Sequence, residues 1–131
     1  MISEQEQTVV EAFFEAYNAR DVDAMDRLLH PDAKITTISS RRGMPDHWRQ
    51  GNTLRYFEQL DEVWTDLRIE VQDYRVLGEC VIALGFLRGA GMVSHIEVVS
   101  EFATVFVVRD SQILVVDSYD TWQAGLDAAR R

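Results

Sequence analysis

Cysteine is almost missing from this sequence of 131 residues, which contains only Cys80. One cysteine cannot form an internal disulfide, so the chain is not a small secreted domain held together by cross-links. Long apolar runs are missing as well. The longest ones, such as Cys80–Leu84, are far too short to cross a lipid bilayer. No basic or apolar leader segment is visible after Met1, and we therefore expect a cytoplasmic protein with no membrane association.

Positive charge is also scarce. The 13 basic residues face 22 acidic ones, which gives a formal net charge of −9. Nucleic acids and anionic membranes require an excess of cations on the protein, so neither is an expected partner. Hydrophobic residues make up 47% of the chain, which is enough for a folded core. We expect residues 1–131 to form one domain.

Several motifs that bind cofactors are missing. Gly89-Ala90-Gly91 joins two expected strands and lacks the third glycine and the helix of a dinucleotide site. The sequence has no phosphate-binding loop, no Cys-x-x-Cys pair and no cluster of histidines with metal-ligand spacing. We therefore expect neither a cofactor nor a metal.

Four segments show the spacing of amphipathic helices. The first starts at a capping box formed by Ser3 and Glu6 and continues to Tyr17. Asp21 is a good N-cap for a short second helix, which should end at His30-Pro31. The third and fourth helices are expected over residues 54–64 and 122–129.

Strand patterns alternate with these helices. A first strand is expected over Ala33–Ser39, followed by an irregular stretch over 40–51. Four further strands are joined by short turns and should pair as an antiparallel meander. They are expected near residues 67–71, 80–88, 94–109 and 112–120. The fold class is therefore α+β, with the order α-α-β-α-β-β-β-β-α and helices that cover one face of the sheet.

The strand over 94–109 is apolar on one face and, toward its end, on both. If helices cover only one face of the sheet, the second apolar face needs another cover. Two copies that meet through this outer face are the simplest source, so we predict a homodimer.

Four segments of the sequence resemble those of a known family. They are Phe13–Asp21, Leu29–Ala33, Val107–Ile113 and Leu126–Ala129. In this order and spacing they resemble the SnoaL-like branch of the nuclear transport factor 2-like superfamily over nearly the whole chain. The resemblance implies a cone in which a curved sheet wraps around helices and leaves a pocket. Such folds serve isomerases, polyketide cyclases, dehydratases, epoxide hydrolases and non-catalytic proteins, so the fold does not define the function.

The resemblance also suggests where catalytic groups would lie. The positions of the acids and the tyrosine in the family's steroid isomerases correspond here to Thr37, Thr104 and Phe13, none of which can act in that way. The histidine and aspartate of the polyketide cyclases correspond to Thr104 and Ser118, and a shift of one or two residues would bring Asp117 or Asp120 into the second position.

Two residues are candidates for acid-base chemistry. Asp120 would be a carboxylate at the pocket mouth, where an apolar setting would raise its pKa, or else a solvated residue or an N-cap at the end of the strand. His47 lies in the irregular stretch and would be an acid or base tuned by pH. Its neighbour Trp48 would be either a lid or an anchor that pins the loop to the body.

Strand alternation predicts which residues line the pocket. On the last strand, Ser118 and Val116 would face it and Ile113 would not. Tyr17 would donate a hydrogen bond to a ligand or simply belong to the core. The expected lining is Phe13, Tyr17, Thr37, Trp48, Phe102, Thr104, Phe106, Val116, Ser118 and Asp120.

Two functions fit this lining. The first is a pocket for a small apolar organic molecule, with or without cofactor-free isomerisation, cyclisation, dehydration or hydrolysis. The alternative is a non-catalytic binding or assembly module of the same fold, because hydroxyl groups orient ligands more readily than they transfer protons.

Overall fold

A computed structural model describes residues 4–43 and 48–130 of the chain. The helices are α1 (Glu4–Ala19), α2 (Val22–Leu28), α3 (Ile38–Arg41), α4 (Thr53–Val63) and α5 (Trp122–Ala129). The strands are β1 (Leu29–Thr36), β2 (Trp64–Leu77), β3 (Cys80–Gly91), β4 (Glu97–Arg109) and β5 (Gln112–Tyr119). The α+β class and the predicted order of elements are confirmed, with the short helix α3 as an addition.

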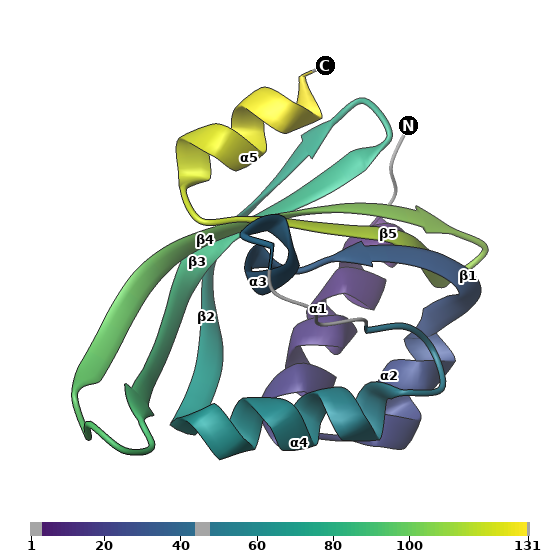
Figure 1. Ribbon diagram of the computed structural model, residues 1–131. Helices are drawn as coiled ribbons and strands as arrows, with labels where there is room; N and C mark the ends of the chain where they lie inside the picture. Colours follow the sequence, from purple (N-terminus) through teal and green to yellow (C-terminus); the bar gives the residue numbers. More distant parts are fainter. Residues whose placement is uncertain (1–3, 44–47, 131) are drawn as a thin grey trace.

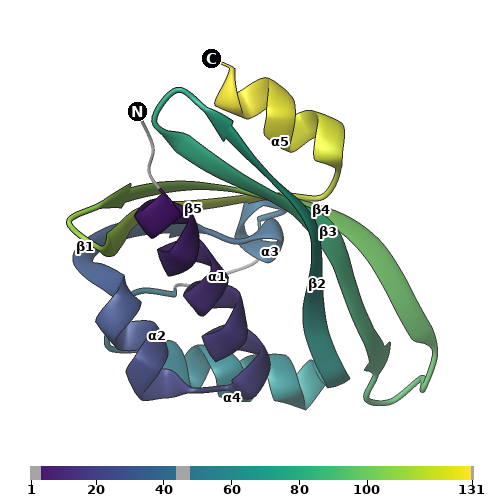
Figure 2. The same cartoon turned by 180° about the vertical axis from the view of Figure 1, so that it is seen from behind.

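The strands form one curved sheet in the order β1-β5-β4-β3-β2. Strands β2 to β5 form the predicted antiparallel meander, and β1 joins its edge parallel to β5. Helices α1, α2 and α4 lie on the concave side of the sheet, while α5 lies on the opposite side (Figures 1 and 2). The sheet therefore has an inner face, toward α1, and an outer face, toward α5.

Local signals account for the ends of the helices. The Asp21 side chain accepts a hydrogen bond from the Ala24 amide at 3.1 Å and caps α2, as predicted. The N-cap of α5 is Thr121 rather than Asp120, since its hydroxyl accepts from the Ala124 amide at 3.1 Å. The predicted capping residue Ser3 lies outside the described residues.

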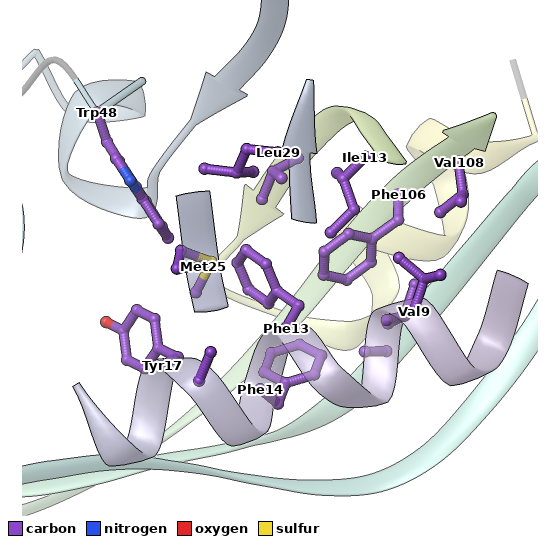
Figure 3. Packing of buried hydrophobic residues seen from close by; sticks show 14 of the residues in the cluster. Val9, Phe13, Phe14, Tyr17, Met25, Leu29, Trp48, Phe106, Val108 and Ile113 are labelled. Atoms are coloured by element: carbon purple, nitrogen blue, oxygen red, sulfur yellow. The ribbon is translucent and has the colours of Figure 1, made fainter. Parts of the chain in front are cut away.

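An aromatic core fills the space between α1 and the inner face. The rings of Phe13 and Phe14 lie 5.1 Å and 5.6 Å from the ring of Phe106, both in edge-to-face geometry. Figure 3 shows these side chains of α1 pointing toward Phe106. Edge-to-face pairs bring the positive edge of one ring against the negative face of another, and they fix the distance between α1 and the sheet.

A second core lies on the outer face. It contains Ile82, Leu84, Ala103 and Val105, and α5 packs on it through Trp122, Leu126 and Ala129. The indole Nε1 of Trp122 donates to the Gly85 carbonyl oxygen at 3.0 Å. The expectation that helices cover only one face was wrong, because α5 of the same chain covers this part of the outer face.

Three boundaries differ from the predictions. Strand β1 begins at Leu29 rather than Ala33, and the end of the predicted strand instead forms α3. Gly89–Gly91 stays within β3, and the turn follows at 92–96, closed by a hydrogen bond from the Gly91 amide to the Ile96 carbonyl oxygen. Ile113 belongs to the inner core because the register shifts between Val107 and Val108. This β-bulge reverses the alternation that the sequence suggested.

Candidate functional site

A cavity of about 250 Å³ lies between α1, α3, α4 and the inner face of the sheet. Its lining includes nine of the residues expected from the sequence: Phe13, Tyr17, Thr37, Trp48, Phe102, Thr104, Val116, Ser118 and Asp120. Further lining residues come from α4 and from the ends of β2 and β3, among them Tyr56, Leu60, Trp64, Leu67, Leu87 and Gly89.

Two expected site residues do not join this set. Phe106 is fully buried and packs against Phe13 and Phe14 instead of lining the cavity. The even positions of β4 do share the inner face, but Phe106 lies further along the strand, where α1 sits against the sheet and leaves no space. His47 lies outside the described residues.

Trp48 forms an aromatic wall of the cavity. Its ring stacks on Tyr56 at a centroid distance of 4.3 Å and lies 5.7 Å from the ring of Phe13. Figure 3 shows the ring of Trp48 on the same side of α1 as Phe13 and Tyr17. Its Nε1 donates to the Thr53 hydroxyl at 3.0 Å, and that hydroxyl donates to Asp26 at 2.5 Å. Only 6% of Trp48 is exposed, because its ring packs into the aromatic core while it also lines the cavity.

Two hydroxyl groups face each other on the sheet side of the cavity. Thr104 of β4 lies directly opposite Ser118 of β5, and their oxygens are 3.0 Å apart. Thr104 is only 4% exposed. The antiparallel register brings the two side chains together, since directly paired residues project from the same face of a sheet.

Thr37 has a structural role in addition to lining the cavity. Its hydroxyl accepts from the Ser40 amide at 3.0 Å, and the Ser40 hydroxyl accepts from the Thr37 amide at 3.0 Å. This reciprocal capping box begins α3 and holds it beside β5.

An ion pair lies at the mouth of the cavity. Arg42 donates to Asp120 at 2.9 Å, and the two side chains are 64% and 49% exposed. The hydrogen bond from Arg42 holds the pKa of Asp120 below its usual value, with the positive charges of Arg42 and Arg41 acting in the same direction. The prediction that an apolar setting raises the pKa of Asp120 was wrong, because its carboxylate lies beside the Arg42 guanidinium rather than an apolar wall.

A second ion pair fastens α3 to the sheet. Arg41 pairs with Asp117, donates from Nε to the Ser118 carbonyl oxygen at 3.0 Å, and lies over the Tyr119 ring at 3.9 Å. The Tyr119 hydroxyl donates to Asp117 at 2.7 Å. Asp117 is therefore engaged on the outer side of β5 and does not line the cavity.

No residue of α4 was predicted to line the cavity. Its apolar residues Leu54 and Val63 are 58% and 59% exposed. Tyr56 and Leu60 of the same helix face the cavity. Their spacing of four residues, one helical turn, was the signal that could have identified them.

Two further observations concern the described residues. Within 4–43 and 48–130, no three His, Cys, Asp or Glu side chains gather as a metal site would require. No helix in the described part of the chain has the length and apolar character that spanning a membrane requires.

A curved sheet around N-terminal helices, with a cavity between them, defines a nuclear transport factor 2-like fold. A protein of this fold from Burkholderia pseudomallei, of unknown function, superimposes with a TM-score of 0.75 over 99% of this chain and all of its own, at 16% identity. Within that fold, the SnoaL-like domain profile matches residues 10–116. The chain therefore belongs to the SnoaL-like domain family.

Two other solved structures are similar in fold. IdmH from Streptomyces antibioticus, a proposed polyketide cyclase, has a TM-score of 0.74 and 18% identity, covering 95% of this chain and 97% of its own. A protein with a ketosteroid isomerase-like fold from Catenulispora acidiphila, crystallised with trimethylamine, has a TM-score of 0.74 and 13% identity, covering 92% of this chain and 91% of its own. No match was found among the curated proteins.

Proposed function

We propose that the protein binds a small, largely apolar organic molecule in the cavity of the inner face. The single observation behind this proposal is an aromatic and aliphatic lining interrupted by a few polar groups. Small-molecule sites usually have this composition, with the polar groups setting the orientation of the ligand. The protein with bound trimethylamine is a fold neighbour that holds a small molecule, which agrees with the proposal.

The size of the cavity bounds the ligand. An engineered cavity of about 150 Å³ holds one benzene molecule. The volume of about 250 Å³ here suits a molecule with one ring and a substituent, or with two small rings.

Binding without catalysis is the function that the polar groups support best. Among the lining residues that the structure describes, Asp120 is the only carboxylate, and Arg42 neutralises it. The acid positions implied by the family resemblance hold Thr37, Thr104 and Ser118, whose hydroxyls do not ionise near neutral pH. Hydrogen bonding to a ligand is the chemistry that these groups perform readily.

Cofactor-free proton transfer is the second candidate function. Asp120 lies at the cavity mouth and is deprotonated near neutral pH, as a general base must be, although its lowered pKa makes it a weaker base. The likeness in fold to a proposed polyketide cyclase is compatible with isomerisation, cyclisation, dehydration or hydrolysis. Asp120→Asn, which keeps the shape of the side chain, should abolish any turnover that is detected if this candidate is right.

The experiment that tests ligand binding is native mass spectrometry of the purified protein. We expect an adduct with the mass of a small organic molecule, which is lost on denaturation. The same measurement on a Ser118→Phe variant, whose ring would occupy the cavity, should show no adduct. An adduct of equal abundance in both proteins would contradict binding in this cavity.

We also propose that the protein is a cytoplasmic homodimer. The near absence of cysteine suits a reducing compartment. Helix α5 leaves Val99 on the outer face 49% exposed, and Val93 and Ile96 in the adjoining turn are 92% and 66% exposed. Such apolar exposure is typical of interaction surfaces. Light scattering at micromolar concentration should give twice the monomer mass, and a monomer would contradict the proposal.

A further inference from the structure

The hydroxyl pair formed by Thr104 and Ser118 has one more donor than it can use internally. Each hydroxyl carries one proton and two lone pairs, and the bond of 3.0 Å between them uses one proton. Among residues 4–43 and 48–130, neither hydroxyl has another hydrogen-bond partner. One proton of the pair therefore remains without an acceptor, whichever hydroxyl donates to the other.

The position of the pair makes this proton available to a ligand. Both side chains line the cavity, and Thr104 is 4% exposed. Phe102 and Val116, which flank the pair on the same face, offer no side-chain acceptor, and the carboxylate of Asp120, two residues beyond Ser118, is bonded to Arg42 at the mouth. Thr104 is buried and Ser118 partly buried, and a donor left without an acceptor in such a place is costlier than an unused lone pair, so the pair favours an acceptor over a donor.

The charge around the pair argues for a neutral acceptor. A carboxylate ligand would need a cation beside it to offset its desolvation. Of the described lining residues, Arg42 is the one cation, and its guanidinium is engaged by Asp120 at the mouth.

We infer that the Thr104–Ser118 pair donates a hydrogen bond to the carbonyl oxygen of a neutral, ring-sized ligand. This inference rests on the proposed function and names the class of molecule that the cavity selects. The aromatic wall holds the ring, and the hydroxyl pair recognises the oxygen. A molecule of the same shape without the oxygen leaves the proton of the pair unsatisfied and binds less tightly.

The test compares acetophenone with ethylbenzene, which share a shape and differ in the carbonyl oxygen. Calorimetric titration of the wild-type protein should show roughly fivefold tighter binding of acetophenone, the increment typical of one hydrogen bond. If water rather than a ligand satisfies the pair, the two probes will bind equally.

Variants locate the source of the preference. In Thr104→Val and in Ser118→Ala, the remaining hydroxyl still carries a proton, so each single variant should keep a preference for acetophenone. The double variant T104V/S118A should lose it while still binding ethylbenzene, which also shows that its cavity is intact. A matched double variant outside the cavity, T8V/S94A, removes two exposed hydroxyls and should leave the preference unchanged.

The outcomes separate this inference from the proposed function. Equal binding of the two probes to the wild-type protein, or a preference that persists in T104V/S118A, would overturn the inference and leave ligand binding in place. If neither probe binds to the wild-type protein at millimolar concentration, the inference is wrong, and the proposed cavity function is wrong as well if native mass spectrometry shows no adduct.

Discussion

The two faces of β4 belong to one strand, but helices pack loosely on the inner face and closely on the outer face. On the inner face, Phe102 and Phe106 hold α1 at a distance, and a cavity remains beside them. On the outer face, Ala103 meets Gly125 of α5, where a Cβ on the glycine would collide with the Ala103 side chain. Large side chains thus keep a helix away from the sheet, and small ones bring it close.

This difference separates the inner face, which can hold a ligand, from the part of the outer face under α5, which contributes stability. Close packing on the outer face leaves no room for a guest but maximises dispersion contacts. On the inner face, the incomplete fit between rings and helices leaves a space lined by apolar atoms. The protein therefore places its cavity on the face with the larger side chains, because rigid rings cannot fill the space between curved sheet and straight helix completely.

The largest expected effect comes from enlarging a side chain on the closely packed face. Gly125→Leu should lower the free energy of unfolding by about 1–3 kcal/mol, since the new side chain forces α5 away from Ala103. Urea unfolding measures this loss. Asp127→Leu, an exposed position of the same helix, is the control and should change stability by less than about 0.5 kcal/mol. Equal stability of Gly125→Leu and the wild type would show that α5 does not pack closely on the sheet.

The same kind of enlargement on the inner face should be tolerated. Ser100 lines the cavity, so the added atoms of Ser100→Leu enter open space and unfolding stability should stay within about 1 kcal/mol of the wild type. The variant should also lose affinity for acetophenone, because the leucine occupies part of the cavity. A loss of stability as large as that of Gly125→Leu would remove the contrast between the two faces.

The smallest expected effect concerns the ion pair at the cavity mouth. Because the folded-state pKa of Asp120 is lowered, its pairing with Arg42 stabilises the fold above the ordinary pKa of 3.8 and ceases to do so as the pH falls through the lower folded value. Asp120→Asn should therefore be slightly less stable than the wild type at pH 7 and equally stable at strongly acidic pH. Urea unfolding across this range, repeated at high salt to screen the pair, measures the difference. A constant difference at all pH values would exclude the ionic contribution.

Local patterns were sufficient where the structure depends on near neighbours in the sequence. The cap at Asp21 and the meander of β2 to β5 follow from side-chain chemistry and spacing within a few residues, and both were predicted. The even positions of β4 were expected to face the pocket, and Phe102 and Thr104 line the cavity. Phe106 could not be excluded from the lining by alternation alone, because the point where α1 contacts the sheet depends on the packing of both.

Contacts between residues far apart in the chain could not be predicted from the sequence. Nothing local indicates that Arg42 lies beside Asp120, and this contact sets the pKa of the carboxylate in the direction opposite to the prediction. The β-bulge opposite Val107 and Val108 could not be predicted from local sequence either. One extra residue in β5 at this point turns Ile113 toward the inner face.

The sequence by itself determined the family, the order of the elements and nine of the residues that line the cavity, because periodicity and capping act over one or two turns of chain. Only the tertiary structure decided that α5 covers the outer face, that Thr104 and Ser118 share a hydrogen bond, and that Asp120 is neutralised at the mouth. These features depend on strand register and on contacts between residues far apart in the chain, which are settled when the elements pack together.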